Sequence, residues 1–406
     1  MSARGALLAG GDGVFSGAMG PLPVRVLKAI DRLVGRTVYR AFLRRHRRTR
    51  PPGDGVMPAR VQKILVVRPG GIGDAVLFFP LLQALRCEFP DAQLDVLAER
   101  RNVGLFGTND VVHRAWAYDR GYGRELLAVV RAGYDVVIDT EQSHFLSAIV
   151  AYLTGAPVRC GFDTQGRGGL FTHRVHYSDQ VYEVHSFLSL FAALTGKRVS
   201  FDPERPFFPI AETHMEWARQ LLAGDGAGAR LAVVLPGAST PLRRWAPERY
   251  RAVVQWLIAQ GLRVAIIGGP GDVEAAAAMS AGLDPRRIIN LAGRTILPRT
   301  AAVIALADVY VSSDTGPLHI AYGIGTPTVH MFGSGILAKW APAGSRYRAV
   351  HKALPCSPCT RYGYTPPCPY GVECMKRIAV EDVIPKLIEA LAERHATTTR
   401  RAPTPK

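Results

Sequence analysis

The sequence predicts an α/β protein with two doubly wound domains that face a cleft, each a parallel sheet covered by helices on both faces. Three observations support this fold class. The chain has 406 residues, 48% hydrophobic and 20% charged, which suits two or three globular domains and excludes a disordered or fibrous chain. Short apolar runs alternate with helical segments along most of its length. A Pro-rich segment, with Pro203, Pro206 and Pro209, separates two such alternating regions.

The first region begins near residue 61. Its strands are short apolar runs, and its helices repeat apolar residues at helical spacing. The predicted strands are Lys63–Arg68, Leu94–Ala98 and Asp135–Asp139, and the predicted helices are Asp74–Glu88, one from about Phe145, and Val181–Leu194.

The second region repeats this alternation. Its predicted strands are Leu231–Leu235, Arg263–Ile267, Ile288–Leu291, Val309–Ser312 and Thr328–Phe332, and its helices lie at about Pro247–Gln260, Asp272–Ala281, Pro298–Ala307, Gly316–Tyr322 and Val380–Glu393. We therefore expect an extension over 1–60, an N-terminal Rossmann-like domain over 61–210 and a C-terminal one over 211–377 with a Cys-rich loop at 355–375. A C-terminal helix and basic tail follow over 378–406.

The positive charge is concentrated in the extension. The chain carries a net charge of +17, and residues 1–60 contribute 12 Lys or Arg against 3 Asp or Glu. After Gly-rich residues 1–20, apolar residues recur at helical spacing from Val26 to Leu43, and basic residues fill the other face. Such a basic amphipathic helix suits an anionic membrane surface. The alternative is a helix docked on the protein's own core with a solvated basic face.

A nucleic-acid partner, a membrane-spanning helix and a secretory signal have less support in the sequence. No aromatic residues interleave with the basic run Arg44–Arg50, so we expect no nucleic-acid partner. The longest uncharged run, Thr315–Ala338, contains too many Gly and Pro residues for a membrane-spanning helix. Gly5–Gly11 is too short for a secretory signal, so we expect a cytoplasmic protein.

Asp74 stands in a Gly-rich turn, Arg68–Asp74, between the first strand and its helix. Glycines allow a ligand to approach the backbone, and free N–H groups at a helix start favour an anion. The dinucleotide fingerprint is not met, because Val76 stands where its third glycine belongs. The carboxylate of Asp74 is interpreted either as a helix N-cap or as a general base that projects into the cleft.

Two later turns carry residues suited to a diphosphate. Pro236–Trp245 combines hydroxyl residues with two arginines, although a solvated surface loop is the alternative. Ser312–His319 places hydroxyls and an acid before a helix that opens at Gly316 or Pro317, and the N-terminus of that helix can face a phosphate. Gly268–Asp272 is a turn of similar type after another strand.

From about residue 61 to residue 390 the chain resembles the lipopolysaccharide heptosyltransferases, glycosyltransferase family 9, which have the two-domain GT-B fold. The order and spacing of five segments make the resemblance specific. They are GGIGDAVLFFP (Gly70–Pro80), PGAS…RRW (Pro236–Trp245), GGPGD (Gly268–Asp272), SDTGPLHIA (Ser313–Ala321) and GTPTVHMFG (Gly325–Gly333).

The resemblance implies roles for these residues. Asp74 matches the family's proposed general base, and Arg243 stands where the family commonly has a phosphate-binding Lys. Arg keeps the charge but presents a planar fork. The implied donor-binding residues are Gly71, Gly73, Ser239, Thr240, Asp272, Asp314, Thr315, Gly316 and His319, with Glu274 as an alternative to Asp272 at the ribose.

The implied activity is an inverting transfer of heptose from a nucleotide sugar, ADP-heptose first among them, to a lipopolysaccharide core. Asp74 would take the proton of the acceptor hydroxyl, and Arg243 with the helix start at Gly316 would stabilise the departing diphosphate, so no catalytic cofactor is expected. Basic residues within Arg159–Arg174 are candidates to meet acidic groups of the acceptor, with solvated loop arginines as the alternative. The implied location is peripheral, on the cytoplasmic face of the inner membrane.

Four of the six cysteines, Cys356, Cys359, Cys368 and Cys374, form a cluster. Four thiolates can hold a tetrahedral structural metal, and reduced or paired packing thiols are the alternative. A branch of the family that glycosylates proteins resembles this arrangement and uses it as a metal-binding finger. Protein O-heptosylation is therefore a second candidate function, and a non-catalytic nucleotide-binding protein is a third. Cys87 and Cys160 are expected to be isolated core residues.

Overall fold

The computed structural model describes residues 30–49, 56–107, 110–120, 123–223 and 229–399. It forms two compact domains, and the second begins at Asp202 rather than at the expected residue 211. The backbone N–H groups of Phe207 and Phe208 donate to the carbonyl of Gly323, at 2.8 and 2.9 Å, and the ring of Phe207 packs edge-on against Tyr322. These contacts attach the Pro-rich segment to the C-terminal domain.

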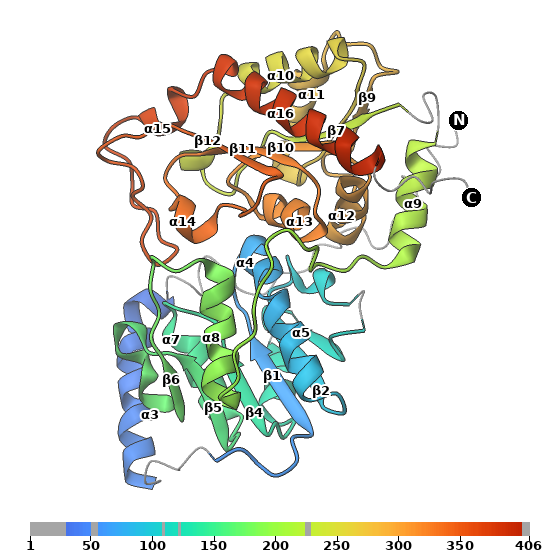
Figure 1. The fold of residues 1–406 in the computed structure, drawn as a ribbon. Helices are drawn as coiled ribbons and strands as arrows, with labels where there is room; N and C mark the ends of the chain where they lie inside the picture. Colours follow the sequence, from blue (N-terminus) through green and yellow to red (C-terminus); the bar gives the residue numbers. More distant parts are fainter. Residues whose placement is uncertain (1–29, 50–55, 108–109, 121–122, 224–228, 400–406) are drawn as a thin grey trace, which may run out of the picture. The chain divides into compact units, whose positions relative to one another are not determined.

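The sheet of the N-terminal domain is parallel, as predicted, with the order β3-β2-β1-β4-β5-β6 (Figure 1). The chain starts in the middle at β1 and winds outward in both directions. The point between β1 and β4 is therefore the topological switch point, where open α/β sheets bind ligands. The strands are β1 Lys63–Val67, β2 Gln93–Ala98, β3 Arg114–Ala117, β4 Val136–Asp139, β5 Val158–Phe162 and β6 His173–Val175.

Helices cover both faces of this sheet. Side chains of α6 and α7 share one apolar core with β1 and β4, and α5 packs against α8 elsewhere in the domain. The predicted helix Asp74–Glu88 is divided at Phe78, because Pro80 cannot donate a hydrogen bond to the preceding turn. The elements are α4 Ile72–Leu77, α5 Phe79–Glu88, α6 Arg124–Val130, α7 Phe145–Leu153 and α8 Glu183–Thr195, with short helices η2 Val103–Leu105 and η4 Thr164–Leu170.

A helix precedes β1 and packs on the same domain. It consists of a π-helical turn, η1 Asp31–Gly35, and α3 Arg36–Thr49. Tyr39 is buried, and Phe42 and Leu43 pack against the core that α7 shares with β1 and β4. The Tyr39 hydroxyl donates to the carbonyl of Arg167 at 2.5 Å. Residues 1–29 and 50–55, which include the Gly-rich start and the first turns of the expected helix, lie outside the described residues.

Asp31 connects this helix to α7. Its carboxylate is 4% exposed and accepts the backbone N–H groups of Phe145 and Leu146, at 3.1 and 2.7 Å. These are the first N–H groups of α7, which have no partner inside the helix. The ring of His144 adds a contact to the same carboxylate at 3.1 Å. An acidic side chain from a remote segment therefore satisfies the start of α7.

The C-terminal domain has a second parallel six-stranded sheet, with the order β12-β11-β10-β7-β8-β9 (Figure 1). Its switch point lies between β7 and β10. All five predicted strands are present, and the edge strand β12 was not predicted. The strands are β7 Leu231–Leu235, β8 Arg263–Ile266, β9 Ile288–Asn290, β10 Val309–Ser313, β11 Thr328–Phe332 and β12 Tyr347–His351.

Helices cover both faces of this sheet as well. α10, α11 and α16 share one apolar core with the sheet, and α12 packs against both α9 and α13. The predicted C-terminal helix corresponds to α16, which buries Val383, Leu387 and Ala390 in this core. The helices are α9 Glu212–Leu222, α10 Pro247–Ala259, α11 Val273–Ser280, α12 Leu297–Ala305, α13 Gly316–Ile324, α14 Leu337–Trp340, α15 Glu373–Lys376 and α16 Val380–Thr399, with short helices η5 Pro241–Arg243 and η6 Pro270–Asp272.

None of the helices in the described ranges combines the length and the apolar character that crossing a membrane requires.

Candidate active site

Asp74 lies at the carboxyl end of β1, beside the switch point of the N-terminal sheet. It occupies the first turn of α4, while Gly71 is the N-cap residue, so the N-cap interpretation of Asp74 is wrong. Its side chain is 25% exposed and accepts a hydrogen bond from Nη2 of Arg68 at 2.8 Å. The carboxylate is therefore both held by a cation and accessible to solvent. Gly71 and Gly73 lie in the same turn.

Arg68 is 1% exposed and extends from the end of β1. Its Nη1 donates to the carbonyl of Thr140, the residue after β4, at 2.7 Å. A Cβ atom added to Gly70 would lie 2.4 Å from Nη2 of Arg68, so only glycine leaves room for the guanidinium there. The amide of Asn102 donates to the carbonyl of Gly70 at 2.9 Å and fixes this turn from another loop.

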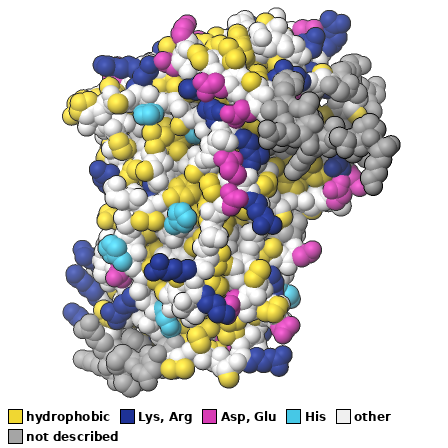
Figure 2. All heavy atoms as spheres, viewed as in Figure 1, with side chains coloured by type: hydrophobic (Ala, Val, Ile, Leu, Met, Phe, Trp, Pro, Cys, Tyr) yellow, Lys and Arg dark blue, Asp and Glu magenta, His cyan; other side chains and the backbone are white. Residues whose placement is uncertain are grey.

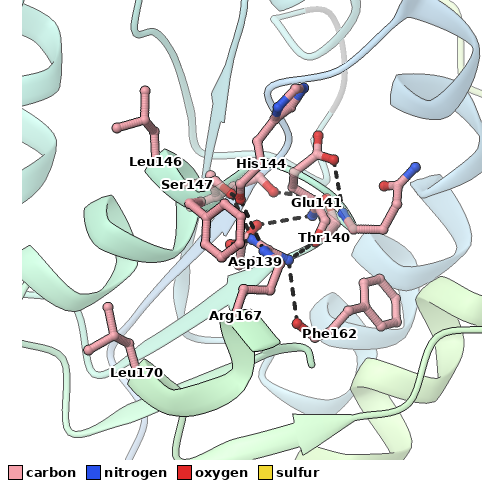
Figure 3. A network of polar contacts seen from close by, with 12 residues as sticks. Asp139, Thr140, Glu141, His144, Leu146, Ser147, Phe162, Arg167 and Leu170 are labelled. Carbon is pink, nitrogen blue, oxygen red and sulfur yellow. Dashed lines mark hydrogen bonds and ion pairs between the residues drawn. The ribbon is translucent and has the colours of Figure 1, made fainter. Parts of the chain in front are cut away.

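A buried polar network follows β4 (Figure 3). Arg167, from η4, lies 2.5 Å from the carboxylate of Asp139, and both side chains are fully buried. Nη2 of Arg167 also donates to the Ser147 hydroxyl at 2.8 Å. Glu141 accepts the backbone N–H of Gln142 at 2.9 Å. The network fixes the loop that also provides the carbonyl of Thr140 to Arg68.

This network corrects the expectation for the basic side chains of Arg159–Arg174. Arg159 is 2% exposed and donates to the carbonyls of Leu170 and Ala156, at 2.8 and 2.5 Å. Arg167 is fully buried. These two are neither acceptor-binding nor solvated arginines, because their donors are used inside the domain. Arg174 is exposed and stays a candidate.

In the C-terminal domain, Arg243 and Asp314 form an ion pair at the switch point between β7 and β10. Nη1 of Arg243 lies 3.0 Å from Oδ2 of Asp314, with side chains 20% and 5% exposed. Arg243 ends η5, and Asp314 directly follows β10. A Cβ atom on Gly335 would lie 2.7 Å from the same Asp314 oxygen, so the backbone after β11 closes over this carboxylate.

The predicted phosphate-binding elements gather around this pair. Thr315 is the N-cap residue of α13, which begins at Gly316 and has Pro317 in its first turn. The N-terminus of α13 presents backbone N–H groups beside Asp314, as an anion site requires. Thr240 starts η5, where its hydroxyl accepts the N–H of Leu242 at 3.4 Å, and the neighbouring Ser239 is exposed.

Asp272, a candidate for contact with the ribose, reaches the turn after β7. Its carboxylate accepts the backbone N–H of Gly269 at 2.8 Å. A Cβ atom on Gly237 would lie 1.9 Å from its Oδ1, so the side chain is packed against that turn. Glu274 is exposed in the first turn of α11. Asp272 therefore has the better placement.

His319 is 4% exposed and lies one turn inside α13. His330 is a fully buried residue of β11. Its burial above all, and then the neighbouring His319, lower the pKa of His330 to about 3. His330 is therefore neutral at physiological pH, and its Nδ1 lies 3.0 Å from the Thr328 hydroxyl.

The cysteine cluster packs behind the end of β11. The N–H of Cys359 donates to the carbonyl of Ser334 at 3.1 Å, and a Cβ atom on Gly333 would lie 3.0 Å from Sγ of Cys374. All four thiols are free, and burial raises the pKa of Cys359 and Cys374. Within the described ranges, no three His, Cys, Asp or Glu side chains are arranged to hold a metal ion. Cys87 is exposed, contrary to expectation, because it lies on the outer side of α5.

Two functional candidates in the N-terminal domain were not identified from sequence. Arg68 carried one signal, since it is a charged residue directly after the apolar run 64–67. Glu141 carried none, because its contacts with the loop after β4 depend on the folded backbone. The Arg68–Asp74 pair lies at the switch point of the N-terminal domain, and the Arg243–Asp314 pair lies at that of the C-terminal domain. The first leaves a carboxylate accessible to a proton donor, and the second combines a cation with a helix N-terminus, which suits a diphosphate.

The comparisons with known proteins agree on one family. The family model described as glycosyltransferase family 9 (heptosyltransferase) matches residues 124–368. Lipopolysaccharide heptosyltransferase 3 of Escherichia coli is 26% identical over 288 residues, which cover 66% of this chain and 83% of that protein.

Solved structures of this kind share the fold. ADP-heptose LPS heptosyltransferase II of E. coli matches with a TM-score of 0.67 and 23% identity, over 82% of this chain and 100% of that one. E. coli heptosyltransferase WaaC, solved with ADP-2-deoxy-2-fluoro heptose, matches with a TM-score of 0.60 and 19% identity, over 81% and 99%. The predicted GT-B class, with two Rossmann-like domains, is thereby confirmed.

Proposed function

Because the chain belongs to glycosyltransferase family 9 and is therefore a glycosyltransferase, we propose that it transfers heptose from ADP-heptose to a lipopolysaccharide core with inversion. The observation that carries this proposal is the Arg243–Asp314 pair beside the N-terminus of α13, which suits the diphosphate of a nucleotide sugar. The names of the relatives support the donor and the acceptor.

In the proposed reaction, the acceptor oxygen forms a bond to the anomeric carbon while the bond from that carbon to the diphosphate breaks. The hydroxyl proton passes to the carboxylate of Asp74, and the electron pair of the broken bond stays on the diphosphate. Arg243 and the N–H groups at the start of α13 stabilise the negative charge that develops there. A single displacement from the opposite face inverts the anomeric carbon, and the proposal requires no metal cofactor.

A donor screen tests this function. We expect release of ADP from ADP-heptose only when a core lipopolysaccharide acceptor that lacks the transferred heptose is present. GDP- and UDP-sugars with the same acceptor, and ADP-heptose without acceptor, serve as controls. Absence of acceptor-stimulated release from every ADP-, GDP- and UDP-sugar would contradict the proposal.

Protein O-heptosylation remains the alternative acceptor, but its only sequence cue was a metal site at the cysteine cluster. That site would consist of Cys356, Cys359, Cys368 and Cys374. Metal binding there stays a prediction, and no observation on this chain favours a protein acceptor over a lipid-linked one. The third candidate, a non-catalytic nucleotide-binding protein, is set aside by the family membership.

We further propose that the enzyme works at the cytoplasmic face of the inner membrane and that the helix η1–α3 lies on anionic lipid. Its docked face is occupied by Asp31, Tyr39, Phe42 and Leu43. Its outer face carries exposed apolar side chains, with Leu33 82% exposed, flanked by exposed arginines. The apolar residues are Ile30, Leu33, Val34 and Val38, and the arginines are Arg36, Arg40, Arg44 and Arg45.

This combination of charge and apolar surface suits a lipid headgroup region. In Figure 2, Lys and Arg side chains gather along the edge of the N-terminal domain where Figure 1 shows α3. The two sequence interpretations are therefore compatible, because docking on the core and binding to lipid use different faces of one helix.

Vesicle binding tests the membrane proposal. We expect the protein to sediment with vesicles that contain phosphatidylglycerol, more weakly as salt rises, and not with pure phosphatidylcholine vesicles. The double variant Leu33→Glu/Val34→Glu should bind at least about 10-fold more weakly, because one buried Leu contributes about 1.5–3 kcal/mol. Ile388→Glu, at an exposed apolar site on α16, is the matched control. Equal binding by the double variant, or assembly of copies through this face, would contradict the proposal.

A further inference from the structure

The guanidinium of Arg68 is shared between several acidic groups. Those that face it come from different elements: Asp74 on α4, Glu141 in the segment after β4, Glu183 on α8, and the phenol of Tyr177 before α8. The contact with Asp74 is a direct ion pair, at 2.8 Å. The other side of the guanidinium lies 5.4 Å from the ring centre of Phe187, which excludes water there.

Glu141 is a permanent negative charge in this group. It is 4% exposed, and burial alone would raise its pKa. The positive charges of His144, Arg68 and Arg167 outweigh burial and lower the pKa of Glu141 to about 2. Its Oε1 also accepts the N–H groups of Gln142 and Ser143 and the hydroxyl of Ser143, at 2.9 to 3.1 Å. The carboxylate is thus held in one place and ionised throughout the working pH range.

We propose that Arg68 is the positioning residue of the proton acceptor Asp74, and that Glu141 limits how strongly Arg68 attracts that carboxylate. The proposal rests on the proposed role of Asp74 as the general base. Two fixed donors direct the fork of Arg68: Nη1 is bound to the carbonyl of Thr140, and Nη2 therefore points to Asp74.

A general base needs both a fixed orientation and a limit on the attraction by the neighbouring cation. Without Arg68, the carboxylate of Asp74, on the short helix α4, would lose the cation that fixes its direction. With the full charge of Arg68 directed at it alone, the carboxylate would be a weak proton acceptor, because an adjacent cation favours its ionised form. Glu141 and Glu183 face the same guanidinium and offset part of its charge. The ion pair with Arg68 thereby orients the carboxylate of Asp74.

The pH dependence of kcat/KM tests this proposal, because two variants should move it in opposite directions. In Arg68→Gln the cation is gone, so Asp74 is protonated more readily and the acid limb of the profile moves up by roughly one pH unit or more. In Glu141→Gln an anion is gone, so the acid limb moves to lower pH. Gln keeps an oxygen at the position of Oε1 and can accept the same three hydrogen bonds.

Three further variants make the result decisive. Arg68→Lys, which keeps the charge but not the fork, should shift the limb less than Arg68→Gln and still lower kcat. Glu125→Gln, which removes a carboxylate that accepts the N–H of Ala117 elsewhere in the domain, should leave the limb in place. Asp74→Asn shows whether the base assignment itself holds.

The outcomes separate the two proposals. If Asp74→Asn stays active, the base assignment fails and the positioning role fails with it. If Asp74→Asn is inactive while Arg68→Gln and Glu141→Gln lower the rate with unmoved acid limbs, only the positioning role is overturned. If Arg68→Gln does not fold, the direction of the Glu141→Gln shift decides alone.

Discussion

Replacement of Asp74 by Asn should lower kcat for heptose transfer by about 10²–10⁴-fold, the usual contribution of a general base. Asn has nearly the same shape and its amide oxygen can still accept the hydrogen bond from Arg68, so the turn should keep its structure. Only the ability to take the acceptor's proton is lost. Single-turnover transfer, followed by mass spectrometry of the lipopolysaccharide product, measures this step directly.

Two control measurements show whether Asp74→Asn loses activity because it fails to fold or fails to bind ADP. Binding of ADP, which we assign to the C-terminal domain, should be unchanged in Asp74→Asn, and so should the midpoint of thermal unfolding to within a few degrees. Asp91→Asn, an exposed carboxylate of the same domain, should transfer heptose at the normal rate. Transfer within about 10-fold of wild type by a folded Asp74→Asn protein would remove Asp74 from the mechanism.

Replacement of Arg243 by Ala should reduce kcat by about 10²–10³-fold, as expected when one donor to a developing anion is removed. Donor binding should weaken as well, because the ground-state diphosphate already carries negative charge. Arg243→Lys should recover part of the rate, since it restores a cation without the planar fork. Single-turnover rates at saturating ADP-heptose separate the catalytic loss from the loss of binding.

Arg243 also neutralises Asp314, and this second role needs its own control. An unpaired buried Asp314 should destabilise Arg243→Ala by about 1–3 kcal/mol in urea unfolding. The double variant Arg243→Ala/Asp314→Asn should regain stability but not activity. Arg244→Ala, an exposed neighbour, should remain active. Recovery of transfer in the double variant would show that Arg243 serves only the fold.

The sequence identified what depends on local pattern. Apolar runs such as Leu231–Leu235 are buried on both faces of a parallel sheet, so they are visible as runs, and Asp74 and Asp314 are visible as polar residues that follow such strands. Three strands of the N-terminal sheet were missed. The edge strands β3 and β6 have four and three residues and begin with charged or polar side chains. The interior strand β5 has Arg159 and Gly161 within its five residues, which interrupt the apolar run.

The contacts that organise the site could not be predicted from the sequence, for a different reason. Arg68 and Thr140 are 72 residues apart, and only the β1–β4 pairing places them side by side. The same holds for the buried ion pair of Asp139 and Arg167. In the sequence, Arg167 was only one of several basic residues in a predicted loop, and nothing connected it with Asp139. Such contacts follow from strand order, which a single sequence does not specify.

The docking of the N-terminal helix has a consequence for how this chain is shortened or compared with its relatives. E. coli heptosyltransferase II aligns over its whole length with 82% of this chain, which suggests trimming to a common core. Removal of residues before β1 would take away the carboxylate of Asp31 and leave two amide groups of α7 without acceptors. It would also uncover the aromatic surface of Phe145, on which Tyr39 packs. The helix is therefore an integral part of the N-terminal domain, and a chain trimmed to begin at β1 would be a damaged form of this enzyme rather than a minimal one.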